Sequence, residues 1–326
     1  MPSAHATRLP AVSCRRDTED RQTKDRLPPW LPFSAIEDAA ERLRGRIVRT
    51  PLLHASALGR DVWLKAETFQ ATGAFKERGA LNRLLRLTAL ERAAGVVAMS
   101  AGNHAAGLAL HAQRLGVAAT IVMPVTAPRC KVERTEALGA EVVLSGANVG
   151  EAKARALQLA AERRLTFVHP YDDPDVIAGQ GTVGLEVLAD RPDLDTLVVP
   201  VGGGGLLAGM AAAVKARKPS VAVVGVRLAR RRGPTLADGI AVDALGKLPQ
   251  ALLVGFVDAL VEVEEGEVAA AMRTLHGAFG MVAEGAGAAA VAALLAGKLP
   301  KEGRTVAVLS GRNVDSDTLV RTLAAA

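Results

Sequence analysis

Four consecutive glycines at residues 202–205 form the segment of this sequence that is best suited to hold an anion. They follow an apolar run that ends at Val201 and precede an Ala-rich stretch that begins at Leu206. Glycine backbones let successive N–H groups turn toward one point, and the first turn of a helix adds a partial positive charge. A tight strand-to-helix turn uses one or two glycines rather than four, so the segment predicts a phosphate-binding loop.

The same glycines also match a dinucleotide-binding pattern, with the spacing Gly203-x-Gly205-x-x-Ala208. An enzyme that binds a nicotinamide dinucleotide in this way needs an acidic residue about 20 residues further on, for the ribose hydroxyl. Here the next apolar run ends at Val226 and is followed by Arg227. The nicotinamide-dependent enzyme therefore stays an alternative, but a disfavoured one.

Lys76 is the candidate nucleophile of the sequence. It follows Phe75 at the end of a segment of Gly, Ala and Thr residues that leads into a helical pattern. Burial in such a place lowers the pKa of a lysine and makes its amine reactive toward an aldehyde. Taken alone, a lysine in this setting is more often a surface cation, so its assignment depends on the other segments.

Two further polar segments, at residues 100–107 and 310–313, each follow an apolar run. They supply short hydroxyl and amide side chains beside free backbone donors, which suit a carboxylate or a hydroxylated ring. An isolated pair such as Asn103 and His104 is usually only a helix cap.

The elements that must position these segments alternate between short β-rich runs and Ala-rich helical stretches. Strands are predicted at 96–99, 120–123, 141–144, 196–201, 221–226 and 305–309, with helices at 151–163 and 206–215 among others. This alternation indicates an α/β protein with a parallel sheet covered by helices. Ligands of such sheets bind at the carboxyl ends of the strands, so the three polar segments are expected to share one cleft.

Composition limits the classes of function. The length of 326 residues suggests two domains. The net charge of +6 is spread among acidic residues and aromatics are only 3%, which argues against nucleic-acid binding, and the basic run Arg230, Arg231 and Arg232 is read as a solvated loop. No apolar stretch is long enough for a membrane span. The two cysteines, Cys14 and Cys130, suggest no disulfide framework, so a cytoplasmic location is expected.

Together, these segments resemble the threonine and serine dehydratases (threonine ammonia-lyases), which are pyridoxal-phosphate enzymes of the tryptophan synthase β-like fold, fold type II. The resemblance runs from about Ile36 to the C-terminus and includes the motifs at 169–182 and 237–241. It implies two open, parallel-rich α/β domains with the cofactor in the cleft between them. The large domain is expected at 31–91 and 168–326 and a small inserted domain at 92–167. Residues 1–30 are expected to be a disordered extension, and no C-terminal regulatory domain is expected.

The resemblance also implies residue roles. Lys76 forms the Schiff base, Phe75 packs beside the ring, Asn103 binds the ring hydroxyl and Ser310 meets the pyridine nitrogen. The implied cofactor-binding residues are Phe75, Lys76, Asn103, Gly202, Gly203, Gly204, Gly205, Leu206, Gly239, Glu284 and Ser310. The implied substrate-binding residues are Ser100, Ala101, Gly102, Asn103 and His104. For Glu284, an ordinary acid at a helix start is the competing interpretation.

The implied reaction removes water and then ammonia from L-threonine, L-serine or both, giving 2-oxobutanoate or pyruvate. A neutral serine at the pyridine nitrogen makes the ring a weaker electron sink, which favours loss of a β-hydroxyl. Lys76 would take the Cα proton. The alternatives among enzymes of this fold are a serine racemase or another β-elimination or β-replacement enzyme. Outside the class of enzymes, the alternative is a non-catalytic cofactor-binding or regulatory protein. A homodimer or homotetramer acting on a small amino acid is expected.

Three positions depart from the family pattern. Ala74 and Arg312 stand where a serine and a glycine are usual, and the Arg312 cation is expected near the ring nitrogen or just behind it. Arg227 stands where many relatives carry a glutamate of a divalent-metal site. Because hard cations need oxygen ligands, no metal is expected here.

Overall fold

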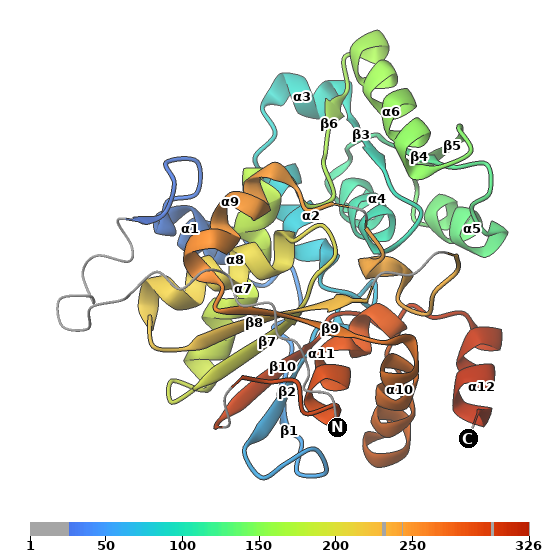
Figure 1. Cartoon of the computed structure of the whole chain (residues 1–326). Helices are drawn as coiled ribbons and strands as arrows, with labels where there is room; N and C mark the ends of the chain where they lie inside the picture. Colours follow the sequence, from blue (N-terminus) through green and yellow to red (C-terminus); the bar gives the residue numbers. More distant parts are fainter. Residues whose placement is uncertain (1–25, 230–232, 243, 301–302, 326) are drawn as a thin grey trace.

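The computed structural model describes residues 26–229, 233–242, 244–300 and 303–325 (Figure 1). Within this part, the folded chain begins earlier than expected. Leu27 is buried and joins the main hydrophobic core, with Trp30 packed against that core. The expected extension at 1–30 is therefore too long by several residues, because these apolar side chains reach the core. Residues 1–25 and the basic run at 230–232 lie outside the described residues.

A large sheet forms the lower half of the molecule as drawn in Figure 1. Its strands lie in the order β1 (Leu52–His54), β2 (Val62–Ala66), β10 (Thr305–Leu309), β7 (Thr196–Pro200), β8 (Ala222–Leu228) and β9 (Ala259–Val263). The β1 strand is antiparallel to β2, and all other neighbours are parallel. The carboxyl ends of β7 and β10 therefore lie at the same edge of the sheet.

A second sheet lies in the upper half of the same view. Its order is β5 (Glu141–Leu144), β4 (Ala119–Met123), β3 (Val96–Met99) and β6 (Thr166–Phe167), and all four strands are parallel. The strands of this sheet come from one continuous stretch of chain, whereas the large sheet uses strands from before and after it. The fold is the α/β class that the alternation predicted.

Helices cover both faces of each sheet. The large sheet has on one face α1 (Phe33–Leu43), α7 (Pro174–Asp190), α8 (Gly205–Arg217) and α9 (Lys247–Phe256), and on the other α10 (Glu265–Phe279) and α11 (Gly285–Leu295). The small sheet packs against α2 (Lys76–Leu85), α4 (Asn103–Leu115) and α5 (Arg129–Ala137) on one face and α6 (Val149–Arg163) on the other. The remaining helices are α3 (Ala89–Ala94), α12 (Ser316–Ala324) and the short η2 (Glu67–Phe69) and η3 (Asp238–Ile240).

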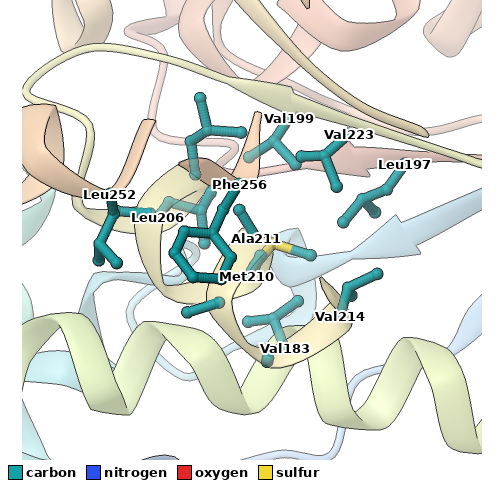
Figure 2. Close-up of a cluster of buried hydrophobic side chains, with 14 of the residues drawn as sticks. Val183, Leu197, Val199, Leu206, Met210, Ala211, Val214, Val223, Leu252 and Phe256 are labelled. Atoms are coloured by element: carbon teal, nitrogen blue, oxygen red, sulfur yellow. The ribbon is translucent and has the colours of Figure 1, made fainter. Parts of the chain in front are cut away.

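The hydrophobic core follows the alternation of side chains along the strands and the helical repeat of the helices. Along β7, Leu197 and Val199 face α7, α8 and α9, whereas Val198 between them faces α10 and α11. Figure 2 shows Leu206 and Met210 of α8 packed against these strand residues. Leu206 thus anchors the first turn of α8, directly after the four glycines, in the hydrophobic core.

Two helices link the sheets. Ala80 and Leu84 of α2 pack with strand residues of the small sheet, while α2 also lies against α7 of the large one. The start of α7 is fixed locally, because the Asp173 side chain accepts hydrogen bonds from the backbone N–H groups of Asp175 and Val176 and Pro174 occupies the first turn. The Lys76 helix is therefore held between both halves of the molecule.

Candidate active site

Lys76 is the first residue of α2, and Phe75 is the cap residue that precedes it. Its half-buried side chain donates a hydrogen bond from Nζ to the Pro170 carbonyl oxygen at 2.8 Å. Burial lowers the pKa of Lys76 to about 8, against the weaker opposite effect of the Glu284 carboxylate. A substantial fraction of this amine is therefore neutral, and so nucleophilic, close to physiological pH.

Aromatic rings surround the amine. Lys76 Nζ lies 5.2 Å from the ring centroid of Phe75 and 5.9 Å from that of Tyr171. The Tyr171 ring meets His169 edge to face, with 4.7 Å between centroids. Burial lowers the pKa of His169 to about 4, so this ring stays neutral. The amine therefore faces two largely apolar rings.

The glycine segment lies directly against this aromatic wall. A Cβ atom on Gly203 would overlap the Tyr171 ring, and one on Gly205 would come within 3.0 Å of the Tyr171 carbonyl oxygen. Gly204 has φ +91° and caps α8, a backbone conformation that favours glycine. The N–H groups in the first turn of α8 have no partner within the helix, so they are available to an anion.

The loop before Lys76 pairs with the loop after β10. The Phe75 N–H donates to the Ser310 carbonyl oxygen at 3.1 Å, and the Arg312 N–H donates to the Gly73 carbonyl oxygen at 2.9 Å. Ala74 and Gly311 form an antiparallel bridge between the same loops. These bonds bring Ser310 beside Phe75, although the two residues are far apart in the sequence.

Asn103 and Glu284 meet at the other side of the site. Asn103 Nδ2 donates to Glu284 Oε1 at 2.6 Å, and both side chains are at least partly buried. Burial, with the nearby Asp238 charge, raises the pKa of Glu284 to about 7. Glu284 is the residue before the first turn of α11, but its side chain forms no cap hydrogen bond, so the competing interpretation as a simple helix-start acid is not favoured.

Gly239 in η3 lies between Gly202 and Glu284. A Cβ atom on Gly202 would lie 3.0 Å from the Gly239 carbonyl oxygen, and one on Gly239 would lie 4.0 Å from Glu284 Oε1. Neighbouring contacts therefore run from Lys76 through Tyr171, the glycines and Gly239 to Glu284, and the Glu284 charge acts back on Lys76. The structure brings these separate motifs together around one region, named here the Lys76 site.

The loop at residues 100–104 leads into α4 at the same site. The Gly102 N–H donates to Ser100 Oγ at 3.2 Å, and Gly102 precedes the first turn of α4. His104 is buried, and its Nε2 lies 3.2 Å from the Val168 carbonyl oxygen. A carbonyl oxygen only accepts, so Nε2 carries the proton, and burial, which lowers the pKa of His104 to about 3, keeps the ring neutral. In the same loop, the side chain of Ala101 is a methyl group, which can neither donate nor accept a proton.

Buried ion pairs fix the first turn of α2 to neighbouring elements. Arg78 is completely buried and donates to Glu67 Oε2 at 2.7 Å and to Glu186 Oε1 at 2.7 Å. Lys65 of β2, also completely buried, donates to Glu186 Oε2 at 2.6 Å. These pairs tie α2 to η2, β2 and α7. A cavity of about 360 Å³ adjoins Arg78 and Glu186 beside α1 and α7, away from Lys76, and its charged groups are already paired.

All three departures from the family pattern can be located, and buried Ala74 forms the bridge to Gly311 described above. The Arg312 side chain is exposed and lies against Gly73. Its expected place near the ring nitrogen or just behind it stays a prediction. Arg227 lies near the end of β8 and is half-buried. Among the described residues, no cluster of three or more His, Cys, Asp or Glu side chains could hold a metal ion.

Three residues at the Lys76 site were not assigned roles from the sequence. Pro170 and Tyr171 contact Lys76, and Asn313 contacts Asn103. The first two lie in the His169-Pro170-Tyr171 motif after β6, and Asn313 ends the segment that follows β10. Both motifs can be recognised in the sequence. Which of their side chains and carbonyl groups face the Lys76 site depends on the conformation of the loop backbone.

Comparison with known proteins agrees with this geometry. The family model of the pyridoxal-phosphate dependent enzymes matches residues 43–311. An L-threonine ammonia-lyase of Thermotoga maritima is 46% identical over 312 residues, covering 89% of this chain and 78% of that protein. The processed form of threonine deaminase isoform 2 from Solanum lycopersicum superposes with a TM-score of 0.83 at 34% identity, covering 90% and 93% of the two chains. Maize serine racemase superposes with a TM-score of 0.84 at 30% identity, covering 89% and 96%.

The chain therefore belongs to the pyridoxal-phosphate-dependent enzymes and has their tryptophan synthase β-like fold, fold type II. The residues present fit this cofactor. The Lys76 site offers an amine of lowered pKa, a glycine segment at a helix N-terminus and an amide donor, the groups that an aldehyde, a phosphate and a ring oxygen need. In the part of the chain that is described, no helix is both long and apolar enough to cross a membrane.

Proposed function

We propose that this protein is a pyridoxal-phosphate-dependent ammonia-lyase that converts L-threonine, L-serine or both to 2-oxobutanoate or pyruvate and ammonia. The observation that carries the proposal is the placement of Lys76. Its amine of lowered pKa lies beside the Tyr171 ring, which packs against Gly203, and within reach of the charge of Glu284, the partner of Asn103. The names of the relatives support the same reaction.

In this proposal the Lys76 site would hold the cofactor. Residues 202–206 hold its phosphate at the N-terminus of α8, Phe75 and Gly239 pack beside the ring, and Asn103 and Ser310 meet its ring oxygen and ring nitrogen. When bound, pyridoxal phosphate supplies an aldehyde for amines and a conjugated ring that takes up the electrons of a breaking Cα–H bond. Ser310 is neutral, which favours prompt loss of a β-hydroxyl over other fates of those electrons.

Lys76 also serves as the acid–base group at Cα. Its pKa of about 8 lies close to physiological pH, so the amine can both accept the Cα proton and release it. The Pro170 carbonyl accepts a hydrogen bond from the amine and holds it at the edge of the site. Loss of the hydroxyl as water leaves an unsaturated amine, which adds water and breaks down to a 2-oxo acid and ammonia.

The loop at residues 100–104 is proposed to bind the substrate carboxylate. Its backbone leads into the N-terminus of α4, where unpaired N–H groups and the helix dipole favour a negative charge. The bond from the Gly102 N–H to Ser100 Oγ shapes this loop. His104, buried and neutral, supports the loop through the Val168 carbonyl.

Serine racemase is the second candidate, because maize serine racemase shares this fold. Inverting Cα needs an acid–base group on the face opposite the lysine, since one base cannot remove and return the proton on different faces. Ala101 stands where the racemases that the chain resembles have a serine, and a methyl group cannot move a proton. Elimination is therefore favoured over inversion.

The proposed function is tested with purified protein, Lys76→Ala and the control Lys298→Ala, whose lysine instead pairs with Glu267. After addition of pyridoxal phosphate and reduction with borohydride, peptide mapping is expected to find the cofactor on Lys76 in the wild type and the control. The Lys76→Ala variant should lose both this attachment and 2-oxo acid formation from L-threonine and L-serine. Attachment at a different lysine would overturn the assignment.

The organisation around the site is part of the same proposal. We expect a large domain at 31–91 and 168–326 and a small domain at 92–167. By resemblance, the chain assembles as a homodimer or homotetramer, which light scattering would measure. A cytoplasmic location is supported by the sparse cysteines.

A further inference from the structure

Asn313 lies between the Lys76 loop and Asn103. Its Nδ2 donates to the Thr72 carbonyl oxygen at 2.8 Å and to Asn103 Oδ1 at 2.6 Å. Asn103 in turn donates from Nδ2 to Glu284 Oε1 at 2.6 Å. A continuous hydrogen-bonded chain therefore connects the loop before Lys76 with the buried acid at the start of α11.

The two ends of this chain determine its direction. A backbone carbonyl can only accept, so the atom of Asn313 that faces Thr72 must be its amide nitrogen. The same nitrogen has a second hydrogen, and Asn103 Oδ1 accepts it. At the other end, Glu284 accepts from Asn103, and the Asn313 backbone N–H also favours its ionised form. The bonds thus run outward from Asn313 Nδ2, to the Thr72 carbonyl on one side and through Asn103 to Glu284 on the other.

The direction matters for what Asn103 offers to a ligand. An amide side chain that is free to turn by 180° presents either an acceptor or a donor. Here the oxygen is occupied by Asn313, and one of the two Nδ2 hydrogens is occupied by Glu284. The donor that is left over is the second N–H of Nδ2, in an amide whose orientation is fixed.

We propose that Asn313 is a positioning residue that fixes the amide of Asn103, so that Asn103 presents its remaining N–H to the ring oxygen of pyridoxal phosphate. This inference rests on the proposed role of Asn103 in the proposed function. A ring oxygen that carries negative charge accepts such a bond and is repelled by an amide oxygen. Asn313 touches neither the ring nor the substrate in this proposal and acts only through Asn103.

The test measures binding rather than turnover. Cofactor-free protein is titrated with pyridoxal phosphate and, separately, with the analogue that lacks the ring hydroxyl. Asn313→Asp replaces the donor by a carboxylate, which can only accept at the pH of the assay and so draws the NH2 group of Asn103 toward itself. The matched control is Asn148→Asp, the same chemical change at the exposed N-cap of α6.

The wild type and Asn148→Asp should bind pyridoxal phosphate more tightly than the analogue. Asn313→Asp should weaken pyridoxal phosphate about ten- to a hundredfold, the range for a hydrogen bond to a charged group, and leave the analogue within about twofold. Asn313→Ala, which frees the amide without reversing it, should give a smaller loss with the same selectivity. In an Asn103→Ala background, Asn313→Asp should add no further selective loss.

Equal weakening of both ligands in Asn313→Asp and Asn313→Ala would show a merely structural role and overturn the inference. Unchanged discrimination in both variants would overturn it as well, while the proposed function would stand. A wild type that binds both ligands equally would remove the proposed role of Asn103 and the inference with it. A wild type that binds neither ligand would overturn the proposed function itself.

Discussion

The amine of Lys76 and the carbonyl of Pro170 are joined by a hydrogen bond of 2.8 Å between Nζ and the oxygen, across 94 positions of sequence. Pro170 precedes Tyr171, whose ring covers Gly203. One short segment after β6 therefore contacts both the candidate nucleophile and the candidate phosphate loop. Burial of the amine at this place lowers the pKa of Lys76 to about 8.

The first prediction concerns the pH dependence of cofactor capture. Only the neutral amine attacks an aldehyde, and burial lowers the pKa of Lys76 to about 8 from an ordinary value of 10.5. At pH 7, about one amine in ten is then neutral, compared with about one in 3,000 for an ordinary lysine. The rate at which cofactor-free protein binds pyridoxal phosphate covalently should rise with pH and level off above about pH 8. Stopped-flow absorbance between pH 6 and 10 measures it, and a rate that keeps rising tenfold per unit beyond pH 9 would contradict the assignment.

The second prediction concerns Gly203→Ala. The added methyl group would overlap the Tyr171 ring, so either the ring or the glycine segment must move. The affinity for pyridoxal phosphate should fall at least about tenfold and the melting temperature should drop. Calorimetric titration and thermal unfolding measure the two effects.

Gly277→Ala is the matched control, since nothing lies within 4 Å of its added carbon in α10. It should raise the free energy of unfolding by about 0.5–1 kcal/mol and leave cofactor affinity unchanged. In the double variant Gly203→Ala with Tyr171→Ala, the overlap is removed. If the overlap is the cause, the double variant should be as stable as Tyr171→Ala alone. A further loss from Gly203→Ala in that background would show another cause.

The third prediction concerns Arg78→Met. Arg78 is fully buried and neutralises Glu67, which is also fully buried. Removing the guanidinium leaves a carboxylate without its main partner, which costs about 3–5 kcal/mol of unfolding free energy. Denaturant unfolding measures the loss. Arg217→Met removes an exposed ion pair with Glu37 and should cost about 1 kcal/mol or less, so equal losses in the two variants would contradict the role of the buried network.

The fourth prediction concerns Ala101→Ser. A hydroxyl at this position supplies an acid–base group that the wild type lacks, so the variant should gain a modest rate of D-serine formation from L-serine. Pyruvate and D-serine are measured together, with Ala118→Ser, an exposed position between α4 and β4, as the control. Formation of D-serine as fast as pyruvate by the wild type would show that the enzyme is a racemase, although the cofactor assignment would survive.

Much of the architecture could be predicted from the sequence. All six predicted strands are present, because buried parallel strands are continuous apolar runs. Among the described residues, four strands were not predicted. The β6 strand has only two residues, and β2 contains Lys65, whose charge interrupts the apolar pattern. Lys65 is tolerated there because its amine donates to the Thr50 carbonyl oxygen and pairs with Glu186, 121 positions away. No local sequence pattern indicates such a distant partner.

The types of residue at the site, and their position after parallel strands, were determined by the sequence alone. Glycine, lysine and asparagine in those loops predicted a phosphate loop, an amine and an amide donor. Only the tertiary structure decided that Tyr171 covers Gly203, that the exposed Arg312 side chain lies against Gly73 and that Asn313 donates to Asn103. These relationships join residues brought together from distant parts of the chain by the packing of two sheets, and the direction of a side chain depends on that packing rather than on its neighbours in sequence.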